Sequence, residues 1–342
     1  MGKVLMSNKN VAVVGATGAV GRAMLSILTE RDFPVGELRL LASARSAGRK
    51  VETAWGEIEV EDLAIADPAG IDIALFSAGG GRSRQHAPLF AEAGAVVIDN
   101  SSAFRMDDQI PLVVAGINDH AAAQHNGIIA NPNCTTMTML MGVAPLHRAA
   151  GLKRMVASSY QAVSGSGKTG IDELSRQTRQ FQANEEALSD GTWVDPGGEV
   201  YARPIAFNVL PLIGDADPHG YTDEELKLLN ETRKILEAPS IEAESTCVRV
   251  PVMTGHGTSA ALWFERPVTP EEAVELINAA PGAQVWLDRV PTPLDAAGID
   301  DVLVGRIRPT LDGTGGLNLW TVGDNLRKGA ALNAVQIAEL LV

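Results

Sequence analysis

Cys134 is one of two cysteines in this chain of 342 residues, and its position is suited to a nucleophile. It follows an apolar run and a proline in Ala-Asn-Pro-Asn-Cys-Thr-Thr-Met, residues 130–137, and a stretch with helical spacing comes directly after it. The N-terminus of a helix carries a partial positive charge and backbone N–H groups that favour a thiolate over a thiol. Asn133 and Thr135 are residue types that cap such an end. A small buried residue without chemistry is the alternative, and the position alone does not decide.

A cysteine nucleophile needs a base, and His256 fits that role best among the six histidines. It lies between two predicted strands and has a glycine on each side, which lets another group come close. Seven residues earlier, Arg249 lies in a predicted strand whose side chains alternate between its two faces. A positive charge on one such face favours an anionic partner. A turn histidine and a solvent-facing arginine would give the same pattern. Cys247, in the same strand as Arg249, is assigned no chemistry.

The turn Gly-Ala-Thr-Gly-Ala-Val-Gly, residues 15–21, is a candidate dinucleotide site. Its glycines allow a tight turn and let backbone N–H groups approach a pyrophosphate at a helix terminus. The spacing departs from the usual Gly-x-Gly-x-x-Gly, and a tight turn without a ligand is the alternative. A predicted strand before the turn and a predicted helix after it favour the dinucleotide.

The residues after the second predicted strand, 38–41, indicate which dinucleotide. A site for NAD usually ends this strand with Asp or Glu, which holds the ribose hydroxyl. Here the strand continues into Ala-Ser-Ala-Arg-Ser-Ala-Gly, residues 42–48, with Arg45 beside Ser46. A guanidinium pairs well with a dianionic 2′-phosphate, so the sequence predicts NADP.

The elements that must position these residues differ between the first third of the chain and the rest. In the first third, strands and helices alternate, which predicts a parallel, doubly wound sheet; the strands are expected at 11–14, 38–41, 71–76 and 95–98, and the helices at 20–30 and 82–93. After residue 150, strands and long helices cluster and predict an antiparallel α+β domain, with strands at 152–160 and within 248–265, helices at 167–188 and 221–238, and a long loop at 191–220. A final helix, 326–341, could return to pack on the first domain.

Composition limits the partners. The net charge of −14 argues against nucleic acid or an anionic membrane, although a local Arg and Lys cluster could still hold an anionic substrate. Two cysteines give neither a disulfide framework nor metal-ligand spacing, so no metal site is predicted. Residues 1–10 lack the apolar core of a signal peptide, and no apolar run is long enough to span a bilayer. The sequence predicts a cytoplasmic protein with reduced cysteines.

Four segments resemble aspartate-semialdehyde dehydrogenase of the bacterial type, in the same order and at similar spacing: Asn131–Thr136, Tyr160–Gly167, Arg249–Val252 with Gly255–Gly257, and Asp324–Ala331. The resemblance implies the fold of the glyceraldehyde-3-phosphate dehydrogenase class. A Rossmann-type NADP-binding domain would comprise residues 1–133 and 326–342, and an α+β catalytic and dimerisation domain residues 134–325. It also implies a homodimer that reduces L-aspartyl 4-phosphate to L-aspartate 4-semialdehyde with NADPH, on the route to lysine, threonine and methionine.

The resemblance further implies a role for each site residue. Cys134 would form a thioester, Gln161 would position it, and His256, with a pKa near the ordinary value of about 6.5, would exchange protons. Arg249 would hold the substrate carboxylate, Arg105 and Lys227 the phosphate, and Glu224 the ammonium, with Asn133 and Gln161 as further substrate contacts. The implied cofactor contacts are Gly15, Thr17, Gly18, Ala19, Val20, Arg45, Ser46, Ser164, Gly165 and Asn325.

Two alternatives stay open. N-acetyl-γ-glutamyl-phosphate reductase shares the fold class, the cysteine and the histidine, but the segments around Cys134 and Gln161 fit it less well. The chain could also be a catalytically silent NADP-binding paralogue that acts as an interaction protein. A complete set of Cys134, Gln161, Arg249 and His256 argues against a silent protein, which has no need of all four.

Overall fold

The computed structural model describes residues 8–183 and 185–342. The chain divides into two compact units. The first unit holds the described residues up to Met137, together with Lys234–Ala238 and Leu326–Val342. The second unit holds Thr138–Arg233 and Pro239–Asn325.

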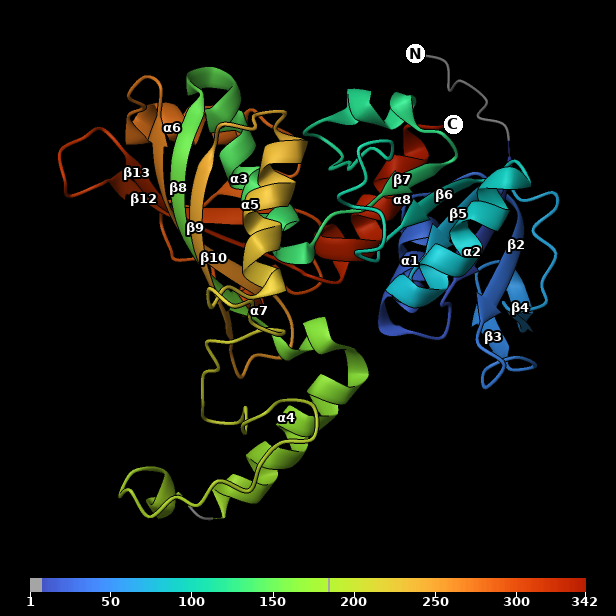
Figure 1. Ribbon diagram of the computed structural model, residues 1–342, viewed down its shortest axis with the longest axis horizontal. Helices are drawn as coiled ribbons and strands as arrows, with labels where there is room; N and C mark the ends of the chain where they lie inside the picture. The colour runs from blue at the N-terminus through green and yellow to red at the C-terminus, as the bar shows by residue number, and fades with distance from the viewer. Residues whose placement is uncertain (1–7, 184) are drawn as a thin grey trace. The chain divides into compact units, whose positions relative to one another are not determined.

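The first unit is built on a seven-stranded sheet with the order β3-β4-β2-β1-β5-β6-β7 (Figure 1). Its strands are β1 (Lys9–Val14), β2 (Val35–Ala42), β3 (Lys50–Thr53), β4 (Gly56–Asp62), β5 (Ile73–Phe76), β6 (Val96–Asp99) and β7 (Ile128–Ala130). Neighbouring strands pair in parallel, except for β3 and β4. The predicted doubly wound parallel sheet is therefore confirmed. The β3–β4 hairpin was not predicted, because its residues are mostly polar and partly exposed and give no apolar run.

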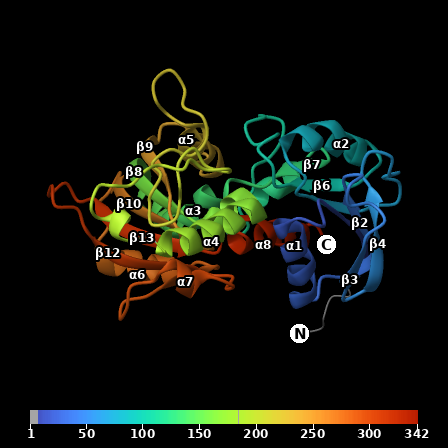
Figure 2. The same cartoon turned by 90° about the horizontal axis from the view of Figure 1, so that it is seen from below.

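Helices complete the first unit. They are α1 (Ala19–Glu30), α2 (Gly80–Glu92), a 3-10 helix (Asp119–Gln124), and the C-terminal α8 (Leu332–Glu339), which a π-helical turn (Arg327–Ala331) precedes. Helices α1 and α8 lie side by side in both views (Figures 1 and 2). Apolar residues of both helices, such as Ile27 and Val335, share one core with β1 and β2. The prediction that the C-terminal helix packs on the first domain is thus confirmed.

The second unit is built on a six-stranded sheet with the order β11-β12-β13-β10-β8-β9. Its strands are β8 (Leu152–Gln161), β9 (Glu242–Arg249), β10 (His256–Phe264), β11 (Ala283–Val285), β12 (Val302–Pro309) and β13 (Leu317–Gly323). The expectation of an antiparallel sheet holds for the pairs β8–β10, β10–β13 and β12–β13, but the sheet is mixed, because β8 pairs with β9, and β11 with β12, in parallel. A parallel neighbour needs a long crossover connection, and residues 162–241 provide one between β8 and β9.

The remaining helices are α3 (Cys134–Ala150), α4 (Gly167–Gln182), α5 (Asp223–Ile235), α6 (Pro270–Asn278) and the short α7 (Pro293–Ala296). Helix α4 ends six residues before the predicted end at 188, and residues 191–220 contain no helix or strand, as expected for a loop. Among the described residues, no helix has both the length and the apolar character that crossing a membrane requires.

Candidate active site

Cys134 is the first residue of α3 and is half-buried. The side-chain Oδ1 of Asn133 accepts hydrogen bonds from the backbone N–H groups of Thr135 at 2.9 Å and Thr136 at 3.2 Å. Asn133 therefore caps the helix, as the sequence predicts, whereas Thr135 lies inside it. The thiol thus lies in the first turn of a capped helix, where the helix dipole favours the thiolate. Both cysteines are among the described residues, and neither forms a disulfide.

Arg105 of the first unit lies against the same turn. It is 8% exposed, and its Nε donates to the carbonyl of Asn131 at 2.9 Å. Its Nη2 donates to the carbonyl of Asn100 at 2.8 Å. Asn100 and Asn131 each follow directly after a strand, β6 and β7, and the carboxyl ends of parallel strands are where open α/β sheets bind ligands. The structure thus brings together Arg105, Asn133 and Cys134.

The glycine turn between β1 and α1 is tightly packed. Gly15 has a φ of +89°, and a Cβ there would lie 2.2 Å from the carbonyl oxygen of Ser77. A Cβ on Gly21 would lie 2.3 Å from the carbonyl oxygen of Gly15. No side chain caps α1 at Gly18, so its first N–H groups can receive an anion. These features fit the pyrophosphate of a dinucleotide.

A cavity of about 170 Å³ lies at this turn. The predicted cofactor residues Gly15, Thr17 and Gly18 line it, and Ala19 and Val20 begin the adjoining helix. Ser46 is close, with its Oγ 3.4 Å from the Oγ1 of Thr17, whereas the exposed Arg45 does not line the cavity. The sequence interpretation missed the other lining residues, which are Ala42, Ser43, Leu63, Ser77, Ala78 and Arg82. Residues 77–82 follow β5, the neighbour of β1, so the strand order is the signal that finds them.

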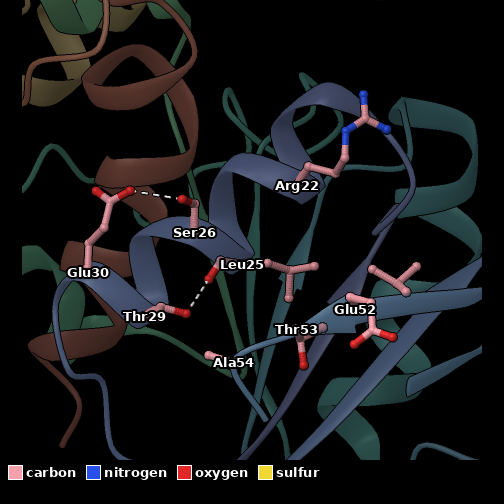
Figure 3. A pocket seen from close by; sticks show the side chains of 9 residues that line it. Arg22, Leu25, Ser26, Thr29, Glu30, Glu52, Thr53 and Ala54 are labelled. Atoms are coloured by element: carbon pink, nitrogen blue, oxygen red, sulfur yellow. Dashed lines mark hydrogen bonds between the residues drawn. The ribbon is translucent and has the colours of Figure 1, made fainter. Parts of the chain in front are cut away.

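A second cavity in the first unit, of about 510 Å³, lies between α1 and residues 51–54 (Figure 3). It contains none of the predicted site residues. Its polar side chains are mostly engaged with the protein, since Ser26 donates to Glu30 at 2.9 Å and Thr29 donates to the carbonyl of Leu25 at 3.0 Å. Arg22 likewise donates to the carbonyl of Thr17 at 2.5 Å. We therefore assign no ligand to this cavity.

In the second unit, the side chains of His256 and Arg249 both form hydrogen bonds with the backbone of Ala162. His256 begins β10, Arg249 ends β9, and Gln161 ends the strand between them, β8. The N–H of Ala162 donates to Nδ1 of His256 at 3.1 Å, and Nη1 of Arg249 donates to the carbonyl of Ala162 at 2.7 Å. A backbone N–H donates only to an unprotonated ring nitrogen, which assigns the hydrogen of the neutral imidazole to Nε2.

Two buried donors of this cluster have no hydrogen-bond partner among the described residues: Nε2 of His256 and Nε of Arg249. A Cβ on Gly165 would lie 2.8 Å from Nη1 of Arg249 and 3.3 Å from Nε2 of His256, so both side chains reach the backbone at this glycine. Unsatisfied buried donors are costly and rare, and a ligand that supplies acceptors is a physical reason for them.

Burial of the imidazole, and next the positive charge of Arg249, hold the pKa of His256 well below its ordinary value of 6.5. The backbone carbonyl of Gly255 acts in the opposite direction to a smaller extent. The expectation of a pKa near 6.5 is therefore wrong. Sequence showed neither the complete burial of the ring nor the nearness of the arginine on another strand.

Gln161, Glu224 and Lys227 form a chain of contacts. The Nε2 of Gln161 donates to Glu224 at 3.2 Å, and Lys227 donates to Glu224 at 3.2 Å and to Asp223 at 2.7 Å. Burial alone would lower the pKa of Lys227, but the carboxylates of Glu224 and Asp223 outweigh it and raise this pKa. Lys227 is thus held cationic beside an acidic residue, which suits a substrate that carries both signs of charge.

The predicted cofactor residues of the second unit also come together. Oδ1 of Asn325 accepts hydrogen bonds from Oγ of Ser164 at 3.0 Å and from the N–H of Gly255 at 2.9 Å. Gly165 follows Ser164 and contacts the Arg249–His256 cluster as described above. No group of His, Cys, Asp and Glu suited to hold a metal ion occurs among the residues that the structure describes.

Comparisons with known proteins identify the family. Residues 10–125 match the model of the semialdehyde dehydrogenase NAD binding domain, and residues 143–328 match that of the semialdehyde dehydrogenase dimerisation domain. The aspartate-semialdehyde dehydrogenase of Streptomyces akiyoshiensis is 54% identical over 336 residues, which cover 97% of this chain and 98% of that one. The chain belongs to the aspartate-semialdehyde dehydrogenase family.

Solved structures of this family have the same fold. Aspartate semialdehyde dehydrogenase II from Vibrio cholerae matches with a TM-score of 0.92 and 46% identity, and the match covers 98% of each chain. A structure of that enzyme complexed with ASA matches with a TM-score of 0.91 and 45% identity, again over 98% of each chain. Aspartate-semialdehyde dehydrogenases are oxidoreductases, so the family resemblance, the fold class and the enzyme class predicted from sequence are confirmed.

Proposed function

We propose that this member of the aspartate-semialdehyde dehydrogenase family interconverts L-aspartyl 4-phosphate and L-aspartate 4-semialdehyde through a thioester on Cys134. The two buried donors without partners, on His256 and Arg249, are the observation that supports the proposal most directly. They lie in a cluster that also contains Gln161 and Ala162, where acceptors of a bound substrate would satisfy them.

Cys134 provides the covalent step. Its thiolate attacks the acyl carbon of aspartyl phosphate, a carbon–sulfur bond forms, the carbon–oxygen bond to phosphate breaks, and phosphate leaves with the electron pair. A bound nicotinamide would supply the hydride that reduces the thioester, after which the carbon–sulfur bond breaks, the semialdehyde leaves and the sulfur of Cys134 returns as a thiolate. His256 exchanges protons with the substrate oxygen at Nε2. Gln161 is proposed to orient the thioester.

In this proposal, each charged group of the substrate is bound by different side chains. Arg249 holds the α-carboxylate with its planar fork, and Arg105 and Lys227 hold the phosphate. Glu224 faces the α-ammonium, and Asn133 contributes a further polar contact at the helix start. A carboxylate on Arg249 would offset the charge that helps to depress the pKa of His256.

The cofactor is proposed to be NADP. The first unit would bind it at the glycine turn, with Thr17, Ser46 and Arg45 near the ribose and its phosphate, while Ser164, Gly165 and Asn325 of the second unit would contact the nicotinamide. The divide at residues 133 and 326 between a cofactor domain and a catalytic, dimerising domain stays a prediction. So do the homodimer, which the match to a dimerisation domain supports, and the cytoplasmic location.

The test compares two semialdehydes in the oxidative direction. NADP reduction is followed with phosphate and either L-aspartate 4-semialdehyde or N-acetyl-L-glutamate 5-semialdehyde. We expect kcat/KM to be at least about a hundredfold higher for the aspartate compound, because its ammonium would pair with the buried carboxylate of Glu224, whereas an acetylated amine brings no charge to it. Comparable kcat/KM values would favour the alternative activity, that of an N-acetyl-γ-glutamyl-phosphate reductase. Turnover of neither compound would favour a silent paralogue.

A further inference from the structure

Asn333, in the C-terminal helix α8 of the first unit, is a fully buried amide that uses all its hydrogen-bonding capacity. Its Nδ2 donates to the carbonyl of Val113 at 2.9 Å and to Oδ1 of Asn131 at 2.6 Å. Its Oδ1 accepts from the N–H of Ala115 at 3.0 Å and from Nζ of Lys328 at 3.0 Å. A buried amide with two donors and two acceptor contacts satisfied fixes the groups around it, because any shift leaves a buried polar group unpaired.

Asn131 is the partner that connects this amide to the candidate site. It is 1% exposed, and its Nδ2 donates to Oδ1 of Asn100 at 2.7 Å and to the carbonyl of Ala330 at 3.2 Å. Its own carbonyl accepts from Nε of Arg105 at 2.9 Å. Only Pro132 separates Asn131 from Asn133, which caps the helix that begins at Cys134.

We propose that Asn333 is a positioning residue for the reaction. Through Asn131 it fixes both the turn that carries Cys134 and the guanidinium of Arg105, although it contacts neither directly. The inference rests on the proposed roles of Cys134 as nucleophile and Arg105 as phosphate ligand. It assigns part of the active-site geometry to a contact between residues 202 positions apart in the sequence.

Asn333→Asp is the informative variant. It keeps the acceptor for the Ala115 N–H and for Lys328, but it replaces the donor to Asn131 and Val113 with an oxygen that both carbonyl-type acceptors repel. Gln336→Met is the matched control. Gln336 lies one turn further along α8, and its side chain accepts from Lys328 at 2.8 Å without a hydrogen bond to Asn131.

The readouts separate positioning from general destabilisation. In Asn333→Asp, we expect the KM for phosphate to rise about tenfold or more and alkylation of Cys134 by iodoacetamide to show a shifted pH profile, because small displacements of reacting groups are costly. The KM for aspartate semialdehyde, which depends on Arg249 in this proposal, should change less than about threefold. Gln336→Met should leave all three values close to those of wild type. Rates are expressed per titrated Cys134 thiol.

An unchanged phosphate KM and an unchanged alkylation profile in folded Asn333→Asp would overturn the proposal, whatever happens to its thermal stability. If that variant does not fold, Asn131→Ala decides. It removes the side-chain link to Asn333 but keeps the Asn131 backbone contacts to Asp99 and Arg105, so wild-type values there would likewise overturn it. Cys134→Ser is run alongside. Full activity of Cys134→Ser would refute the proposed function itself, which distinguishes that failure from a failure of the positioning role.

Discussion

The two units hold their proposed reactive groups in different ways. In the first unit, Cys134 is half-buried at the start of a helix, and an asparagine cap together with a buried amide network fixes its turn. In the second, His256 is fully buried and lies close to Arg249, which is 6% exposed, and both bond to the peptide of Ala162. The first arrangement favours an anion by orienting dipoles, and the second places a titratable base beside a fixed cation.

This difference has a chemical consequence. The start of a helix favours a thiolate through the oriented dipoles of its backbone, and the half-buried side chain of Cys134 is partly exposed to an electrophile. The imidazole next to Arg249, by contrast, is kept neutral, because burial and the neighbouring charge both disfavour its cationic form. We therefore expect substitutions in the first unit to act mainly on chemistry and cofactor binding. Substitution of His256 should also change the pH dependence of stability.

The largest expected effect comes from Cys134→Ser. It should reduce kcat by about a thousandfold or more, since a serine hydroxyl is far less acidic than a thiol and a much poorer nucleophile near neutral pH, so the covalent step is lost. NADP affinity, measured by fluorescence titration, should stay within about twofold of wild type, because the glycine turn is untouched.

Cys247→Ser is the matched control for that variant. Cys247 is the other cysteine of the chain, fully buried in β9, and its backbone N–H donates to Glu225 at 3.0 Å. We expect some loss of thermal stability and a kcat close to that of wild type. More than about a hundredth of wild-type activity in Cys134→Ser, or an equal loss in both variants, would refute the thioester mechanism.

The second expected effect, of intermediate size, concerns cofactor choice in the first unit. Arg45→Gln should weaken NADPH relative to NADH by about tenfold or more, since a charge-assisted contact to the 2′-phosphate contributes about 1.5–3 kcal/mol. Arg82→Gln should weaken both cofactors to a similar degree, because Arg82 lines the cavity at the glycine turn that both would occupy. The measurement is the ratio of the two apparent dissociation constants.

Arg84→Gln is the control for these variants, since Arg84 lies on the same helix as Arg82 and does not line the cavity. A changed ratio in Arg82→Gln together with an unchanged ratio in Arg45→Gln would show that the sequence interpretation chose the wrong arginine. That error would be understandable, because Arg45 stands out only by its place after the second strand.

Much of the first unit can be predicted from sequence, because its central strands are short apolar runs such as Val11–Val14, every residue of which is buried. The β3–β4 hairpin carries no such run. The direction of β9 beside β8 could not be read at all, because pairing depends on how a long crossover returns and not on the residues of either strand.

The site residues follow the same division. Local motifs predict Cys134 and His256 as site residues, the family resemblance adds Gln161, and residue type predicts the cap by Asn133, which the structure confirms. The neutral state of His256 was not foreseen, because it depends on burial and on an arginine that ends another strand. The amide pair of Asn131 and Asn333 was missed for a similar reason, since two distant asparagines carry no mark of their contact.

The smallest expected effect uses the depressed pKa of His256. In the unfolded chain the histidine gains a proton as the pH falls below about 6.5, whereas in the folded protein it stays neutral to lower pH. The unfolded state therefore binds more protons in this range, so a falling pH stabilises the unfolded state relative to the folded state. The contribution of the neutral imidazole to stability is present above pH 6.5 and is lost as the pH falls from 6.5 toward the folded-state pKa.

His256→Asn removes the titration. At pH 7 this variant should be less stable than wild type, because it leaves a gap and disturbs the hydrogen bond from Ala162. The difference should then shrink below pH 6.5, by up to about 1.4 kcal/mol per pH unit, since only the wild-type protein loses stability through this group. Unfolding by urea, followed by circular dichroism at pH 7, 6 and 5.5, measures the difference.

His219→Asn, which changes an exposed ring, should follow the wild-type dependence on pH. A stability difference between His256→Asn and wild type that stays constant from pH 7 to 5.5 would mean that His256 titrates alike in both states. The proposed contrast between a helix terminus that favours an anion in one unit and a buried imidazole that stays neutral in the other would then be refuted.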